Sequence, residues 1–333
     1  MNAQRIRWGI LGTANIARKN WKAIQLTGNG TVTAVGSRDR ERSRRFVAEC
    51  QAEAPMEPAP HAFGSYADVL ASDQVDAVYV PLPTGVRAEW VVRAAEAGKH
   101  VVCEKPCAPS VADLRRMLEA CQSHDVQFMD GVMFMHSRRL ELLREVIHDG
   151  ENVGHVRRVR SAFTFRQSPE FFAENIRTQS VLEPHGCLGD LGWYCLRFAL
   201  WARDWELPLQ VGGRILSEHR RPDSPAAVPT AFSGELLFAG GVSADFYCSF
   251  LTETEQWARL SGTRGVVHLS DFVLPLEGTE VAFELHHTDF RVRGCDFRMK
   301  DKRRRFTVAE HSHGHASAQE CNLFRNFAEQ VQS

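Results

Sequence analysis

IRWGILGTANIA, residues 6–17, places a run of apolar, strand-forming residues directly before a turn of small residues and an amphipathic helix. The turn fits a G-x-G-x-x-G frame with alanine at its second and third positions. In this frame the first residue permits a tight turn, the second lets the backbone approach a pyrophosphate, and the third lets the helix pack on the strand. The helix start offers N–H groups to phosphate. We expect cofactor contacts from Gly12, Thr13, Ala14, Asn15 and Ile16.

Short apolar strands alternate with amphipathic helices as far as about residue 130. Ser65 with Asp68, and Ser110 with Asp113, have the spacing of a helix N-cap with an acidic third position, and Gly98 follows a helix where a left-handed residue often stands. This alternation is typical of βαβ units and a parallel sheet. The strands are predicted at 6–11, 31–36, 77–80, 100–103 and 126–129.

After about residue 150 the pattern becomes that of an antiparallel sheet. Strand-length apolar or alternating segments occur at 156–165, 232–238 and 242–250, Gly240-Gly241 suits a hairpin turn, and one helix is expected near 189–200. The fold class is therefore an α/β Rossmann domain plus an α+β domain with a large open-faced, mostly antiparallel sheet. The expected boundaries are 1–130 for the first domain, 131–315 for the second, and 316–333 for a C-terminal helix packing near the Rossmann domain.

The C-terminal segment combines a start signal with one apolar face. Ser317 and Glu320 have the spacing of a capping box, and the apolar face carries Leu323, Phe324, Phe327 and Val331. No stop signal follows, which suggests a helix cut short.

Composition excludes several classes of function. The 333 residues carry a net charge of −1, which argues against broad attraction to nucleic acid or anionic membranes. No apolar segment has the length of a signal core or membrane span. Nine cysteines without paired CxxC spacing indicate reduced thiols in a cytoplasmic protein. His311-x-His313-x-His315 is interpreted as a polar loop, so no metal is expected, and the charge run at 300–305 as a solvated strand edge.

The residues after the second strand bear on the choice of dinucleotide. An NAD enzyme usually places an acidic residue there for the adenosine ribose. Here the strand ends at Gly36 and is followed by Ser37, Arg38 and Asp39, with Arg42 one turn further. A hydroxyl and guanidinium groups suit a 2′-phosphate, since Arg makes bidentate charge-assisted bonds to phosphate. NADP is favoured over NAD, although Asp39 is able to serve the ribose if the arginines are only a solvated helix start.

A lysine follows the strand predicted at 100–103. AGKHVVCEKP, residues 97–106, ends in Glu104-Lys105-Pro106, and a lysine beyond the carboxyl end of a parallel strand faces the ligand crevice. This stretch resembles, nearly letter for letter, the signature of the Gfo/Idh/MocA oxidoreductase family. A second stretch, GCLGDLGWY at 186–194, resembles the family's glycine-rich segment. On an α-helix its Asp190 and Tyr194 would share one face.

The resemblance implies the chemistry and its residues. It places the active-site lysine at Lys105, the acid/base at Tyr194 as in glucose-fructose oxidoreductase-like members, and an orienting role at Asp190. Lys105 as the base is the alternative. It also implies hydride transfer to or from a sugar, polyol or dihydrodiol, and a dimer formed through the open sheet.

Further contacts are expected in the family's loops. Pro81, Pro83 and Thr84 lie in a cofactor loop in which Arg87 replaces the usual histidine, and Glu104 lies beside the lysine. Weaker substrate candidates are His136, Arg138 and His185. Two other functions exist on this scaffold, a non-catalytic NAD(P)-binding regulator and an NAD-dependent glycosidase. Retention of the lysine, aspartate and tyrosine together argues against the regulator.

Overall fold

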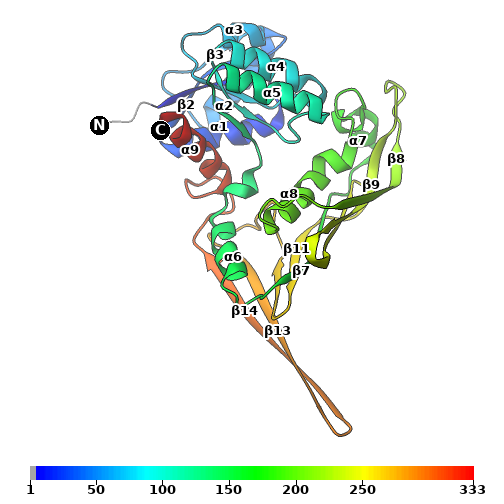
Figure 1. Cartoon of the computed structure of the whole chain (residues 1–333). Helices are drawn as coiled ribbons and strands as arrows, with labels where there is room; N and C mark the ends of the chain where they lie inside the picture. Colours follow the sequence, from blue (N-terminus) through cyan, green and yellow to red (C-terminus); the bar gives the residue numbers. More distant parts are fainter. Residues whose placement is uncertain (1–4) are drawn as a thin grey trace. The chain divides into compact units, whose positions relative to one another are not determined.

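The computed structural model describes residues 5–333, which divide into two compact units (Figure 1). The first unit contains the residues up to His136 and also takes in two later segments, Val181–Pro184 and His313–Ser333. The second contains Ser137–Ser180 and His185–Ser312. The segment Val181–Pro184 belongs to the first unit although its neighbours in the chain belong to the second, and no sequence pattern predicts this.

The first unit is built on a parallel six-stranded sheet of order β3-β2-β1-β4-β5-β6. Every paired neighbour in it runs parallel, as the βαβ alternation predicts. Its strands are β1 Ile6–Leu11, β2 Gly30–Gly36, β3 His61–Phe63, β4 Ala77–Val80, β5 His100–Cys103 and β6 Phe128–Asp130. The order reverses direction at β1, so the crevice beyond the carboxyl ends of β1 and β4 is where an open α/β sheet binds its ligand.

Helices bury both faces of this sheet. One apolar core joins α1 (Asn15–Thr27), α2 (Arg40–Glu53) and α9 (Gln319–Gln332) to β1 and β2. The other core lies under α3 (Tyr66–Leu70), α4 (Thr84–Glu96) and α5 (Val111–Ser123). The predicted N-caps are present, because the hydroxyls of Ser65 and Ser110 each accept an N–H from the residue three positions on, at 3.1 Å.

The second unit is an eight-stranded sheet of order β14-β13-β12-β11-β7-β10-β9-β8. All neighbours are antiparallel except β7 and β10, which confirms a mostly antiparallel sheet. The strands are β7 Val156–Thr164, β8 Gln210–His219, β9 Val228–Phe238, β10 Val242–Ser249, β11 Glu255–Gly262, β12 Val266–Leu269, β13 Val281–Arg293 and β14 Asp296–Val308.

Helices accompany this sheet in greater number than expected. The sequence indicated one, near 189–200, which corresponds to α8 (Trp193–Ala202) lying on β7 and β10. The structure adds α6 (Arg138–His148) and the short α7 (Pro169–Glu174). The guanidinium of Arg139 on α6 is buried and pairs with Asp271 at 2.5 Å and with the carbonyl of Ala282, which fixes α6 beside β13 and the segment after β12.

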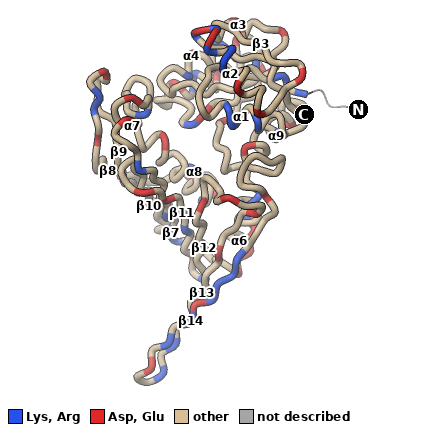
Figure 2. The backbone as a smooth tube through the Cα atoms, turned by 180° about the vertical axis from the view of Figure 1, so that it is seen from behind, with Lys and Arg blue, Asp and Glu red and all other residues tan. Residues whose placement is uncertain are grey.

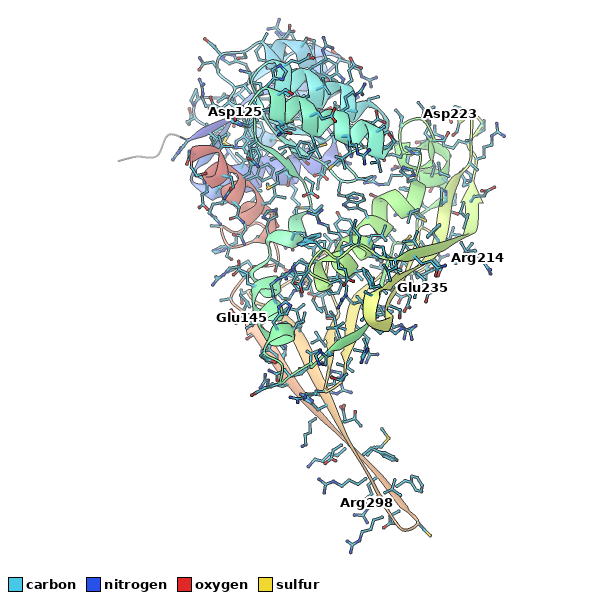
Figure 3. The ribbon with its side chains drawn as sticks, viewed as in Figure 1. Asp125, Glu145, Arg214, Asp223, Glu235 and Arg298 are labelled. Atoms are coloured by element: carbon cyan, nitrogen blue, oxygen red, sulfur yellow. The ribbon has the colours of Figure 1, made fainter. Side chains whose placement is uncertain are left out.

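Strands β13 and β14 continue past the rest of the sheet as a long hairpin (Figure 1). The register pairs Phe290 with Met299 and Val292 with Phe297, so these four side chains share one face. All four are more than half exposed. Figure 3 labels Arg298 on this projecting part of the hairpin.

Two local expectations were wrong. Helix α9 begins at Gln319, and Ala318 rather than Ser317 occupies its N-cap. The Ser317 hydroxyl contacts the His315 ring, and the Glu320 carboxylate accepts the N–H of Gly314. The strand predicted at 126–129 lies instead at 128–130.

Across residues 5–333 we find no helix with the length and apolar character of a membrane span.

The apolar face of α9 is confirmed and supplies a stability test. Phe324 is 1% exposed and packs edge-on against Trp8 and Tyr79, with ring centroids 5.2 and 5.6 Å apart. Phe324→Ala should lower the free energy of unfolding by about 3–5 kcal/mol, the usual cost of deleting a buried aromatic ring. Urea unfolding measures this, with the exposed Gln330→Ala as control. Equal stability of the two variants would contradict the packing described.

Candidate active site

The turn after β1 has the geometry that a pyrophosphate requires. Gly12 has a φ of +112°, which favours glycine, and a Cβ at this position would lie 3.2 Å from the Leu82 side chain. Ala14 stands at the N-cap of α1 without a side-chain hydrogen bond, so its side chain does not cap the first N–H groups of the helix. These groups and the dipole form an anion site, which fits the phosphates of a dinucleotide.

A basic cluster lies beside this turn. Arg42 donates to the hydroxyl of Thr13 at 2.7 Å, although the two residues are 29 positions apart. Burial raises the pKa of the Tyr66 hydroxyl, and the guanidinium groups of Arg38 and Arg42 oppose that rise, so both cations lie close to this hydroxyl. A Cβ on Gly12 would be 4.0 Å from the same oxygen. The sequence did not indicate Tyr66 as a site residue. The only feature that could have done so is its position at the start of α3.

The residues between β2 and α2 occupy the position where a dinucleotide-binding domain contacts the adenosine ribose. Asp39 caps α2, with its carboxylate accepting the N–H of Glu41 at 2.9 Å. Ser37 is buried and its hydroxyl accepts the N–H of Asp39 at 3.4 Å. One oxygen of the Asp39 carboxylate is therefore engaged in capping, and Arg38 and Arg42 stand near it as exposed cations at the strand end.

The turn after β5 carries the half-buried Lys105, and its flanking residues are held tightly. Glu104 is 6% exposed, with one carboxylate oxygen accepting the Tyr79 hydroxyl at 2.6 Å and the other accepting the N–H of Lys105 at 3.3 Å. Burial, then the Glu104 carboxylate, hold the pKa of Tyr79 well above its usual value, so Tyr79 remains a donor. The peptide bond between Lys105 and Pro106 is cis. Glu104 thus shapes the turn, while Lys105 stands on it.

The loop after β4 is occupied by a later segment of the chain. Pro83 is the N-cap of α4, and both the N–H and the hydroxyl of Thr84 donate to the carboxylate of Glu183, at 3.0 and 2.6 Å. Gly85 donates to the carbonyl of Leu182 at 2.8 Å. Glu183 therefore caps α4, and the polar groups of Thr84, which was expected to contact the cofactor, are engaged within the unit. Pro81 follows β4 directly.

In the second unit, Asp190 and Tyr194 stand on a helix with an irregular turn. Leu188–Gly192 forms a π-turn that runs directly into α8, so regular α-helical spacing between the two residues was wrong. Asp190 pairs with Arg177 at 2.7 Å, a partner that the sequence did not suggest. Tyr194 is 7% exposed and packs edge-on against Phe163 with ring centroids 5.3 Å apart.

Glycines let this helix lie directly on the sheet. Gly186 has a φ of +46°, and a Cβ there would be 2.2 Å from the carbonyl oxygen of Pro229 on β9. A Cβ on Gly192 would be 3.0 Å from the sulfur of Cys248 on β10. The glycine-rich segment is thus required for close packing, which places Asp190 and Tyr194 at one end of α8.

The weaker substrate candidates have varied surroundings. The ring of His136 contacts the amide of Asn326 on α9 at 3.2 Å, and its carbonyl accepts from Asn322, so the first unit holds it in place. Arg138 is exposed and its N–H donates to Glu310 at 2.6 Å. His185 is exposed, and its carbonyl accepts the N–H of Gly189 in the irregular helix.

Comparisons with known proteins agree with this geometry. Residues 6–132 match the model described as "Oxidoreductase family, NAD-binding Rossmann fold" of the GFO/IDH/MocA group, and residues 140–268 match its C-terminal domain. The chain is 31% identical to the D-xylose 1-dehydrogenase (NADP(+)) 2 of Haloferax volcanii, over 90% of this chain and 86% of that protein. It is 28% identical to the trans-1,2-dihydrobenzene-1,2-diol dehydrogenase of Mus musculus, over 82% and 77%.

Solved structures show the same fold. A 3-ketoreductase from Actinomadura kijaniata in complex with NADP and TDP-benzene superposes with a TM-score of 0.76 at 25% identity, covering 98% of this chain and 90% of that one. The structures of that ketoreductase include one variant with a tyrosine changed to phenylalanine and one with a lysine changed to alanine.

Proposed function

Because the chain belongs to the Gfo/Idh/MocA oxidoreductase family, we propose that it transfers hydride between NADP and a hydroxyl-bearing carbon of a sugar, polyol or dihydrodiol. The observation that carries this proposal is the half-buried Lys105 on a turn whose flanking groups are fixed at the carboxyl end of β5. The relatives named for xylose and dihydrodiol oxidation, and the ketoreductase solved with NADP, support the substrate class.

The residues of this chain divide the work as follows. Bound NADP would supply the hydride acceptor or donor, and this chain's residues would bind the substrate and move its proton. Lys105 hydrogen-bonds the substrate oxygen and polarises it, and Tyr194 takes or returns the hydroxyl proton. Asp190, held by Arg177, orients the substrate beside the tyrosine. The mechanism requires Lys105 and Tyr194 to meet at one bound substrate, although 89 positions separate them in the sequence.

The catalytic assignment is tested by two single substitutions. Activity is first sought with NADP⁺ on D-xylose, D-glucose, myo-inositol and trans-dihydrobenzenediol, followed by the absorbance of the reduced nicotinamide. Tyr194→Phe and Lys105→Met should each lower kcat by about 10²–10⁴, the usual contribution of a positioned proton donor or acceptor. The double variant should lose less than the product of the two losses, because groups acting as a unit are not additive.

Tyr247→Phe is the matched control for these variants, since the Tyr247 hydroxyl bonds Thr252 at 2.7 Å on the same sheet. It should leave kcat unchanged. A near wild-type rate for Tyr194→Phe would transfer the acid/base role to Lys105.

The preference for NADP follows from the basic cluster of Arg38 and Arg42. Arg38→Ala should raise the Kd for NADP⁺ about 10- to 100-fold, because a hydrogen bond to a charged group contributes about 1.5–3 kcal/mol. The Kd for NAD⁺, which lacks the 2′-phosphate, should barely change. Isothermal titration measures both, with Arg44→Ala on α2 as control, since Arg44 pairs with Glu41. Tighter binding of NAD⁺ than of NADP⁺ by the wild type would refute the assignment.

The dimer is proposed through the face of the second sheet opposite α8. Paired residues across seven strands place one row of side chains there: Glu235, Asp245, Arg160, Arg259, His268, Glu284 and Arg305. The row is acidic at its β9 end and basic at β14. Figure 2 shows basic and acidic positions across these strands, and Figure 3 labels Glu235 on β9. A two-fold axis parallel to the strands would stack the acidic end on the partner's basic end.

This arrangement predicts a charge-swap rescue. Glu235→Lys and Arg305→Glu should each shift the protein toward monomer in light scattering coupled to size exclusion, because each places like charges in contact. The double variant should restore the dimer, while Arg93→Glu in the first unit should have no effect. A monomeric wild type, or a double variant as monomeric as the single ones, would rule out this interface.

A further inference from the structure

Arg87 is a buried cation on α4. Its guanidinium donates hydrogen bonds to three backbone carbonyls. The residue is 5% exposed. Its Nε donates to the carbonyl of Leu82 at 2.5 Å, and its Nη1 donates to the carbonyls of Glu104, at 2.8 Å, and Pro106. A single side chain thus joins the loop after β4 to the turn after β5.

The two carbonyls in the second turn bracket Lys105 in the chain. They belong to the residues directly before and after the lysine, so the guanidinium fixes the backbone on both sides of it. The carboxylate of Glu104 is held from elsewhere, by Tyr79. Backbone and side-chain contacts therefore restrain the Lys105 turn independently.

The chemistry of the contact calls for arginine. Three carbonyl oxygens that converge in a buried region repel one another, and each costs free energy if left without a donor. A guanidinium presents five donors in a rigid planar fork and stays charged, whereas a lysine ammonium is a compact donor on a flexible stem. A histidine here would offer at most two ring donors.

We propose that Arg87 is a positioning residue for the reaction, acting through Lys105 by holding the turn that carries its ammonium. This inference rests on the proposed catalytic role of Lys105. The hydrogen bonds of Arg87 go to backbone oxygens. Its contribution is therefore to keep the Lys105 ammonium where the substrate oxygen binds. Errors of about 1 Å in such placement can cost about 10²-fold in rate.

The primary test is a double-mutant cycle with Lys105. The assays use NADP⁺ and whichever compound of the panel above the wild type oxidises fastest. Arg87→Met should lower kcat about 10- to 100-fold with little change in the Kd for NADPH, as expected for lost placement of a reacting group. In a Lys105→Met background the same substitution should change the residual rate less than about twofold, because the two residues act as one unit.

A second measurement is independent of turnover. Hydrogen exchange of the peptide covering 101–108 should be faster in Arg87→Met than in the wild type, and unchanged in Arg93→Met, an exposed position on the same helix. If Arg87→Met does not fold, Arg87→Lys replaces it. Arg87→Lys keeps the positive charge but loses the planar guanidinium. It should show faster exchange at 101–108 and a smaller fall in kcat than Arg87→Met.

The outcomes separate this inference from the proposed function. A wild-type kcat in the folded Arg87 variant, an unchanged exchange rate at 101–108, or an undiminished effect in the Lys105→Met background would each overturn the positioning role while leaving the proposed function intact. Full activity of Lys105→Met alone would instead overturn the proposed function, and with it the premise of this inference.

Discussion

The buried guanidinium of Arg87 ties together two loops that a parallel sheet leaves separate. Neighbouring parallel strands end at the same edge, but no ladder hydrogen bonds connect the loops beyond them. Here one cation bonds the carbonyl of Leu82 after β4 and those of Glu104 and Pro106 after β5. Leu82 in turn lies beside the Gly12 turn, where an added Cβ would come within 3.2 Å of its side chain. The loop after β4 and the lysine turn are therefore parts of one braced edge.

Much of this was accessible from the sequence because it depends on local rules. Five of the six strands of the first unit follow from apolar runs of the right length, whereas the three-residue β3 (His61–Phe63) was missed because it is too short to show a pattern. The caps at Ser65 and Ser110 follow from a three-residue spacing. The face of α9 that includes Phe324 follows from helical periodicity. The positions of Lys105, Asp190 and Tyr194 came from resemblance to known motifs, and their catalytic roles await the tests above.

What the sequence did not reveal depends on contacts between distant residues. Glu183 caps α4 across 99 positions, and Arg177 reaches Asp190 from a separate turn. Helix α9 begins two residues later than its expected N-cap at Ser317, whose hydroxyl contacts the His315 ring. In the sequence, Arg87 is only a departure from the histidine usual at this position of the family's loop. Its hydrogen bonds to three carbonyls from two loops depend on the fold and have no sequence pattern.

The π-turn at Leu188–Gly192 has a bearing on how this helix can change. A π-turn accommodates one residue more than an α-turn in an otherwise regular helix. Because the wider turn absorbs its extra residue, removing one residue from it would let ordinary α-geometry return while the helix on either side keeps its orientation. Asp190 lies within this turn and Tyr194 just beyond it. Deleting one residue between them would therefore shorten their separation along the helix, a change in chain length that no substitution scan would sample.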